Sequence, residues 1–321
     1  MSGIRQSYQK QWLSVQEQLE KLKERGLIIS DEAMARDALR SHGYYRLSGY
    51  WHVFRQVNLD EISDQFQVGT TFEHVMALAE FDKSIRNIFF SMLESIEIGF
   101  RTRVAHIVGK TSPSAHLDPS TYGKKWCENS APHQTTRNFN WVESEIVKYE
   151  RRSQDEFVKH FRAKYEPPMP IWITVEVWDF RFLSRIYEGL TFNLKQELSQ
   201  SFGLTDQKVL GNWMHSLSLV RNICAHHGRL WNRPLVKQIA HPQPGEVSLF
   251  DAIAPDHRPK STSRIYGAAV AGQHLLKQLH MNPQWAQEFV SCVKAFPANQ
   301  DISPEKSMGF PNQWQWHKDW S

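Results

Sequence analysis

Apolar residues recur every three or four positions along most of the chain, which is the spacing of one face of an α-helix. The longest such stretch runs from Thr71 to about Val108 and contains no proline and one glycine, Gly99. At a rise of ~1.5 Å per residue it predicts a helix of roughly 55 Å, kinked near Gly99, at the centre of a bundle. Alternating strand patterns are nearly absent, although residues 171–178 are rich in β-branched side chains. We therefore predict an all-α, multi-helical bundle with a long central helix.

Shorter helices are predicted on both sides of the central one. A cap at Ser30 opens a short helix to His42, and Thr205-Asp206 caps a helix that runs to about His227. The other predicted helices are 9–25, 140–165, 171–190, 193–201, 263–280 and 283–296. The pattern divides the chain into an N-terminal helical region (1–60), a helical domain (61–296) with a loop insertion at about 110–138, and a Pro/Trp-rich tail (297–321).

Composition indicates a globular protein: 40% of the 321 residues are hydrophobic and 22% are charged. No apolar run approaches the roughly 18 residues of a membrane span, and the polar N-terminus lacks the apolar core of a signal peptide. The three cysteines lie far apart, which excludes a disulfide framework. We expect a soluble, cytoplasmic protein that does not bind a membrane. The 12 tryptophans predict an aromatic-rich core, with base stacking as a second interpretation of any exposed ring.

Positive charge is concentrated in one segment. Residues 201–240 hold five Lys and Arg side chains against the single acid Asp206, so this segment accounts for the whole net charge of +4. A local excess of this kind favours an anionic partner at one site.

The same segment carries an Arg-x4-His pattern, Arg221 to His226. That spacing alone is weak evidence for a site. An Arg lies five to seven residues before a His at three other places along the chain, and once more within this motif, from Arg221 to His227. Helical geometry is more informative: Leu210, Trp213, Leu217, Val220 and Cys224 form one apolar stripe. Asn222 and His226 fall together on another face, with Arg221 between the two. The motif therefore predicts an amide, a guanidinium and a titratable imidazole on the polar side of an anchored helix.

The extended motif Arg-Asn-x-x-Ala-His-His (221–227), followed by Arg-Leu-Trp-Asn-Arg (229–233), resembles that of bacterial abortive-infection (Abi D/F-like) proteins within the HEPN superfamily. Other segments resemble the same family: Tyr-Tyr-Arg-Leu-Ser-Gly-Tyr-Trp (44–51), Phe-Asp-Lys-x-Ile-Arg (81–86), Glu94-x-x-Glu97, Arg101-Thr102, Pro170-x-Trp172 with Glu176, and Met-Gly-Phe-Pro (308–311). The resemblance implies a HEPN-type helical fold and, for an intact motif, metal-independent RNA cleavage with no cofactor. It also implies a homodimer, since such nucleases build one site from two motifs.

The chemistry of RNA cleavage explains the residue types. RNA carries its own nucleophile, the 2′-hydroxyl, so the enzyme needs proton transfer and positive charge rather than a metal-bound water. A histidine with an ordinary pKa of about 6.5 transfers protons at neutral pH, and arginine binds phosphate bidentately. We assign proton transfer to His226, phosphate binding to Arg221 and an orienting role to Asn222. The candidate RNA-binding residues are His227, Arg229, Arg233 and Lys237.

Several alternatives stay open at this point. The protein can bind RNA, such as a cognate non-coding RNA, without cutting it. Arg229 and Arg233 have a structural explanation as well, because positive side chains are stabilising near the C-terminus of a helix. Cys224, His226 and His227 are weak zinc candidates, because no partner pair has suitable spacing. Glu94, Glu97 and Arg101 form either a paired-carboxylate site or, as we favour, an ion network that supports the motif helix. The aromatic residues Tyr44, Tyr45, Tyr50 and Trp51 stack bases or, by default, pack in the core.

Overall fold

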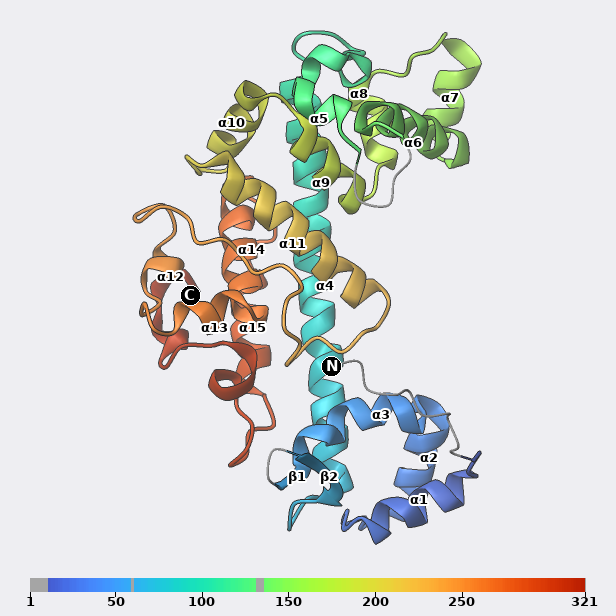
Figure 1. Cartoon of the computed structure of the whole chain (residues 1–321), viewed down its shortest axis with the longest axis vertical. Helices are drawn as coiled ribbons and strands as arrows, with labels where there is room; N and C mark the ends of the chain where they lie inside the picture. Colours follow the sequence, from blue (N-terminus) through green and yellow to red (C-terminus); the bar gives the residue numbers. More distant parts are fainter. Residues whose placement is uncertain (1–10, 59–60, 131–135, 321) are drawn as a thin grey trace. The chain divides into compact units, whose positions relative to one another are not determined.

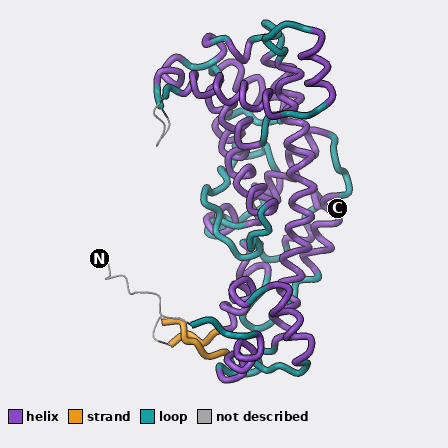
Figure 2. The backbone as a smooth tube through the Cα atoms, turned by 90° about the vertical axis from the view of Figure 1, so that its right-hand side faces the viewer, coloured by secondary structure: helices purple, strands orange, loops and turns teal. Residues whose placement is uncertain are grey.

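The computed structural model describes residues 11–58, 61–130 and 136–320. Helices account for most of the described chain, and strands occur only in one antiparallel pair (Figure 2). The predicted all-α, multi-helical fold is therefore confirmed. The hairpin of β1 (Arg55–Asn58) and β2 (Glu61–Phe66) was not predicted, because its strands are too short to show a clear alternation.

The chain divides into two compact units. One consists of Met1–Lys83 and Ala295–Ser303, and the other of Ser84–Lys294 and Pro304–Ser321. The long helix α4 (Phe72–Val108) contributes residues to both, and it is continuous over 37 residues, as the pattern predicted (Figure 1). No helix of the described residues is long and apolar enough to cross a membrane.

The first unit is a small helical cluster with the hairpin beside it (Figure 1). Its helices are α1 (Val15–Glu24), α2 (Glu32–His42), α3 (Tyr44–Trp51), a 3-10 turn at His52–Phe54 and the start of α4. Ser14 and Glu17 form a capping box at the start of α1. The cap of α2 is Asp31, whose carboxylate accepts the Met34 N–H at 2.9 Å; the predicted cap, Ser30, instead donates to the Glu73 carboxylate.

The aromatic segment 44–51, to which the sequence pattern assigned no element, forms helix α3. Trp51 and Tyr50 are buried, and the Tyr50 hydroxyl donates to Asp82 at 2.8 Å. These two rings therefore belong to the core, as expected. Tyr44 is half-buried, whereas the Tyr45 side chain is 71% exposed, so core packing does not account for it.

The second unit contains the remaining helices. They are the rest of α4, α5 (Lys124–Glu128), α6 (Asn138–Arg152), α7 (Glu156–Lys164), α8 (Ile171–Thr174), α9 (Phe180–Gly189), α10 (Phe192–Ser201), α11 (Gln207–Ala225), α12 (Ser248–Asp251), α13 (Arg258–Thr262), α14 (Ile265–Leu279) and α15 (Trp285–Lys294). Short 3-10 or π turns occur at Ala115–Leu117, Pro119–Thr121, Val175–Val177, Pro304–Met308, Trp314–Trp316 and Lys318–Trp320.

Three predicted elements of this unit need correction. The helix expected over 140–165 is two helices, because the chain is extended between Arg152 and Glu156. The helix expected over 171–190 is interrupted: Trp178 is extended, and Asp179 caps a new helix by accepting the Phe182 N–H at 2.7 Å. The β-branched run at 171–177 thus forms α8 and a 3-10 turn rather than a strand. The region 110–138, expected to be a loop, holds α5 and two 3-10 turns.

Two glycines of the second unit, Gly99 and Gly272, lie where α4 and α14 pack too closely for a larger side chain. A Cβ on Gly99 would lie 2.5 Å from a Leu279 methyl carbon, and one on Gly272 would lie 2.0 Å from the Met92 sulfur. Real Cβ atoms do not approach other atoms so closely, so glycine lets these two helices pack at short range. Gly99 therefore serves helix packing.

Candidate functional site

Helix α11 is anchored by one buried face. Its N-cap is Asp206, as predicted, and the stripe of Leu210, Trp213, Leu217, Val220 and Cys224 is buried. The Trp213 indole N–H donates to the Ala240 carbonyl at 2.8 Å, which ties the helix to the following loop. The helix also packs against α9, α10 and α14. These contacts fix the position from which the polar residues of α11 project.

The end of α11 lies two residues before the predicted one. The helix ends at Ala225, and His226 is its C-cap, with its N–H donating to the Asn222 carbonyl at 3.0 Å. His227 adopts a left-handed backbone conformation with φ +55°, and Gly228 donates to the Ile223 carbonyl at 2.8 Å. With the bond from the His227 N–H to the Cys224 carbonyl, this is a Schellman C-cap in which histidine replaces the usual glycine. Both imidazoles are exposed at the helix end.

Arg221 connects the motif helix to α4. Its Nε lies 3.5 Å from the Glu97 carboxylate, and the other oxygen of Glu97 accepts from Arg101 at 2.7 Å. Arg101 also donates to the Trp178 carbonyl, at 2.6 and 3.1 Å. The Glu97 side chain is only 8% exposed, whereas that of Arg221 is 33% exposed. The structure therefore brings together one buried carboxylate and two arginines, the arrangement of an ion network that supports α11.

Burial raises the pKa of Glu97, and the neighbouring Arg101 and Arg221 oppose this rise. Two carboxylates, Glu94 and Glu97, and two guanidiniums, Arg101 and Arg221, line this place, so their charges balance. Glu94, one turn away on α4, is exposed and does not share the contact, so the carboxylates of Glu94 and Glu97 are not a matched pair.

A small cleft of about 220 Å³ opens beside Arg221. Its lining combines the charged network with two exposed apolar side chains of α4, Phe90 and Ile98. The full lining is Phe90, Glu94, Glu97, Ile98, Arg101 and Arg221. His226 does not line this cleft. The structure thus places Arg221 in a cleft and His226 at the exposed helix end.

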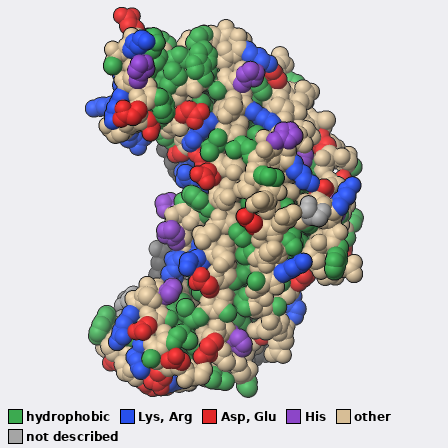
Figure 3. All heavy atoms as spheres, turned by 180° about the vertical axis from the view of Figure 1, so that it is seen from behind, with side chains coloured by type: hydrophobic (Ala, Val, Ile, Leu, Met, Phe, Trp, Pro, Cys, Tyr) green, Lys and Arg blue, Asp and Glu red, His purple; other side chains and the backbone are tan. Residues whose placement is uncertain are grey.

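The candidate RNA-binding residues follow α11 along an irregular segment. Arg233 and Lys237 are exposed and Arg229 is half-buried, while Leu230 and Trp231 between them are buried. On the face seen in Figure 3, basic, acidic and apolar side chains alternate, so positive charge is not a general property of this surface.

A larger cavity of about 660 Å³ follows the polar face of α11 toward its N-terminus. Lys208 and His215 of α11 line it together with Arg185, Lys195 and Lys237, and the acids Glu188 and Asp206 line it as well. Burial lowers the pKa of His215, and the positive charge of Lys237 lowers it further. The sequence did not single out this cavity. The spacing of Lys208 and His215, two turns apart on the face of Asn222, was the available signal.

No three His, Cys, Asp or Glu side chains among the residues that the structure describes are grouped so that they could hold a metal ion. Cys224, one of the weak zinc candidates, lies in the buried stripe of α11.

These features define the class: an all-α protein with an arginine–histidine motif at the end of a buried helix, joined to a long central helix by an ion network. Residues 37–232 match the sequence model of a family described as Abi-like protein, and this match covers more than half of the chain. The chain belongs to that family, which supports the abortive-infection resemblance and a role in phage defence. The matched region includes the motif and the central helix but not the segment 308–311. No curated protein and no solved structure matches the chain.

Proposed function

We propose that this protein is an abortive-infection effector that cleaves RNA without a metal, as a HEPN-type endoribonuclease. The observation that carries the proposal is the placement of Arg221. Glu97 holds its guanidinium at the edge of a cleft, five residues before an exposed histidine at the end of the same helix. The ion pair uses Nε, and no other ion pair of Arg221 occurs within the described ranges. The terminal nitrogens are thus able to take a phosphate.

In the proposed reaction, the 2′-hydroxyl oxygen attacks the adjacent phosphorus and the bond to the 5′-oxygen breaks. Arg221 stabilises the charge that develops on the phosphoryl oxygens. A base removes the proton of the 2′-hydroxyl and an acid gives one to the leaving 5′-oxygen, and His226 carries out one of these two transfers. Asn222, one turn before His226, orients the imidazole or a phosphate oxygen. The products are a 2′,3′-cyclic phosphate and a 5′-hydroxyl, and no water is consumed in this step.

We propose a homodimer as the working unit. The reaction needs both a base and an acid, and each chain offers a single motif with Arg221 and His226. A two-fold axis supplies a second copy without additional sequence. Phe90 and Ile98 support this arrangement, because they are 41% and 43% exposed directly beside the Arg221 cleft. Apolar side chains of this kind suit the centre of an interface.

We propose that the RNA strand follows the basic surface around α11. Exposed Arg233 and Lys237 after the helix, with His227 and Arg229 at its end, provide phosphate contacts. The cavity that holds Lys208, His215 and Lys237 extends this surface along α11. Binding of this type is salt-dependent, since each neutralised phosphate releases counterions.

Cleavage of a labelled RNA by the purified protein, with and without EDTA, tests the proposal. We expect activity to persist in EDTA and the products to carry 2′,3′-cyclic phosphate and 5′-hydroxyl ends. An RNA with a 2′-deoxy sugar at the scissile position should resist cleavage, because the nucleophile is absent. Cleavage of the deoxy substrate, or activity that EDTA abolishes, would contradict the mechanism.

One observation favours a second function, RNA binding without cleavage. Arg221 forms an ion pair with a buried carboxylate, and His226 does not line the same cleft. In that case a cognate non-coding RNA would occupy the basic surface. Sequencing of the RNA that co-purifies with the protein, combined with the cleavage assay, separates the two: a single bound species that stays intact favours binding alone.

A further inference from the structure

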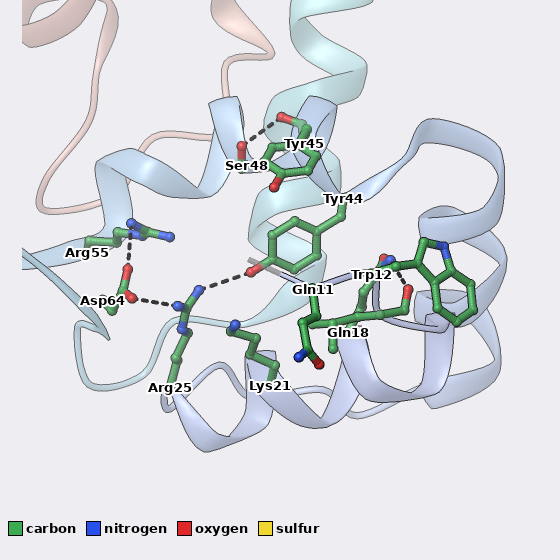
Figure 4. Close-up of a pocket in the computed structure, with 11 residues that line it drawn as sticks. Gln11, Trp12, Gln18, Lys21, Arg25, Tyr44, Tyr45, Ser48, Arg55 and Asp64 are labelled. Atoms are coloured by element: carbon green, nitrogen blue, oxygen red, sulfur yellow. Dashed lines mark hydrogen bonds and ion pairs between the residues drawn. The ribbon is translucent and has the colours of Figure 1, made fainter. Parts of the chain in front are cut away.

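A second cavity lies in the first unit and contains no residue of the arginine–histidine motif. Its volume is about 560 Å³, which is within the usual range of roughly 300–1,000 Å³ for small-molecule sites. Helices α1 and α3 and the hairpin β1–β2 form its walls, together with the segment just before α1 (Figure 4). The cavity therefore belongs wholly to one compact unit.

The cavity has an excess of positive charge. Three cations line it, Lys21, Arg25 and Arg55, against the single acid Asp64. Asp64 lies between the two guanidiniums, with one oxygen 2.5 Å from Arg25 and the other 3.1 Å from Arg55 (Figure 4). The two arginine side chains are only 16% and 17% exposed, so they are held in fixed positions.

The arginines carry more donors than these contacts use. Arg25 donates to Asp64 and to the Tyr44 hydroxyl, the latter at 3.0 Å, and Arg55 contacts Asp64 through one terminal nitrogen. The Nε–H of Arg55 is buried, so the donors that a ligand can reach are the terminal N–H groups that Asp64 and Tyr44 leave unused. Since each guanidinium has five N–H donors, the pair retains capacity for an anionic ligand with several oxygens.

Aromatic rings line the other part of the cavity. Trp12 is 85% exposed and Tyr45 is 71% exposed, which is unusual for side chains of this size beside a cavity. Tyr44 lies next to Tyr45 on α3, with ring centroids 5.9 Å apart, and its hydroxyl points toward Arg25 (Figure 4). Stacking surfaces and guanidiniums thus lie within one cavity.

We propose that this cavity binds a nucleotide, with the base stacked on Tyr45 and the phosphate held by Lys21, Arg25 and Arg55. Aromatic rings accept the face of any base, and guanidinium groups match the geometry of phosphate oxygens. The ligand is either a free nucleotide or one nucleotide of a single-stranded RNA, because both present the same base and phosphate. This site is independent of the cleavage proposed for Arg221 and His226.

Calorimetric titration of the full-length protein tests the proposal with four probes. They are adenosine 5′-monophosphate, adenosine, ribose 5-phosphate, and a 2′-O-methyl hexaribonucleotide that 2′-hydroxyl attack cannot cleave. We expect the monophosphate to bind more tightly than adenosine and ribose 5-phosphate, because only the monophosphate engages both parts of the cavity. A hexamer that binds much more tightly than the monophosphate, and that loses this affinity in Tyr45→Ala, identifies single-stranded RNA as the ligand; equal affinity identifies a free nucleotide.

Variants locate the binding. Tyr45→Ala should weaken binding about tenfold, the scale of one lost base stack, and Lys21→Gln should weaken it severalfold. The matched controls are Trp316→Ala and Lys83→Gln, whose side chains are 77% and 61% exposed and lie outside the cavity. Arg221→Ala, which should abolish cleavage, should leave monophosphate affinity unchanged. Absence of binding by both the monophosphate and the hexamer would overturn the proposal, as would equal losses in the cavity and control variants.

Discussion

Arg221 on α11 and Glu97 on α4 form an ion pair with 3.5 Å between Nε and a carboxylate oxygen, although they lie far apart in the sequence. Glu97 is almost fully buried and is itself held by Arg101. The position of the motif arginine is therefore decided by the central helix, which gives Glu97 a positioning role in the proposed reaction.

Glu97→Gln should lower both activity and stability. The amide keeps the shape of the side chain but removes the charge that orients Arg221, so we expect RNA cleavage to fall about ten- to a hundredfold, the scale of a misplaced catalytic group. The free energy of unfolding should fall by about 1–3 kcal/mol, because two arginines lose their anionic partner. Denaturant unfolding and cleavage assays measure the two effects. Glu80→Gln is the control: its carboxylate is 65% exposed on α4 and does not line the Arg221 cleft, so both quantities should stay unchanged.

His226→Ala should abolish RNA cleavage and toxicity while the protein remains folded. The side chain is exposed at the end of α11, so its truncation should change the free energy of unfolding by no more than about 0.5 kcal/mol. Thermal unfolding by circular dichroism and the cleavage assay provide the measurements. His42→Ala, at an exposed position at the end of α2, serves as the control. A variant that cleaves RNA normally would exclude His226 from the reaction.

His227→Gly separates a conformational role of this residue from RNA binding. The left-handed backbone at φ +55° costs a side-chain-bearing residue about 1 kcal/mol relative to glycine. We therefore expect His227→Gly to be at least as stable as the wild type and His227→Val to be less stable by about 1–2 kcal/mol. If the imidazole binds RNA, the glycine variant should also show weaker RNA binding in a filter-binding assay. Unchanged affinity would leave His227 as a helix cap alone.

Ile98→Glu should weaken the proposed homodimer. The side chain is 43% exposed beside the Arg221 cleft, so a charge there should be tolerated in the monomer but opposed in an apolar interface. Multi-angle light scattering at rising ionic strength, with and without RNA, gives the oligomeric state. Val147→Glu, at a 60% exposed position of α6, is the matched control. A wild-type protein that cleaves RNA as a monomer under all these conditions would rule out the dimeric site.

Burial of His116 should make the protein less stable in mild acid. The side chain is fully buried against Trp178, and burial lowers its pKa from 6.5 to about 4. Because the folded pKa lies below the unfolded one, the unfolded chain takes up the proton first as the pH falls. The contribution of neutral His116 to the free energy of unfolding is therefore fully present above about pH 6.5 and decreases between pH 6.5 and 4. At pH 5 the decrease is about 2 kcal/mol.

Urea unfolding at pH 7.5 and pH 5 measures this loss, and His116→Phe isolates the contribution of this residue. Other buried histidines, such as His274, also titrate in the range, since burial lowers the pKa of His274 too. The difference between wild type and variant cancels their effect. We expect the variant to lose about 2 kcal/mol less than the wild type between the two pH values. Parallel pH profiles would contradict the assignment.

The sequence by itself determined the local features. Helical periodicity gave the all-α fold, the extent of α4, the Asp206 cap and the buried stripe of α11, because each depends on residues within a few turns. The motif and its neighbouring segments also predicted the family correctly. The breaks within 140–165 and 171–190 were missed, since an extended residue such as Trp178 between two helices is stabilised by burial rather than by its neighbours in sequence.

Tertiary structure alone decided which distant side chains meet. The contact of Arg221 with Glu97 requires α4 and α11 to lie side by side, and no local pattern specifies that register. The cavity around Lys21, Arg25, Arg55 and Tyr45 likewise collects residues from two helices and a hairpin. Packing also decided where α11 ends: the Schellman turn at His226 and His227 turns the chain so that Leu230 and Trp231 enter the core. Periodicity reports which face of an element is buried, whereas the partner that buries it depends on long-range packing.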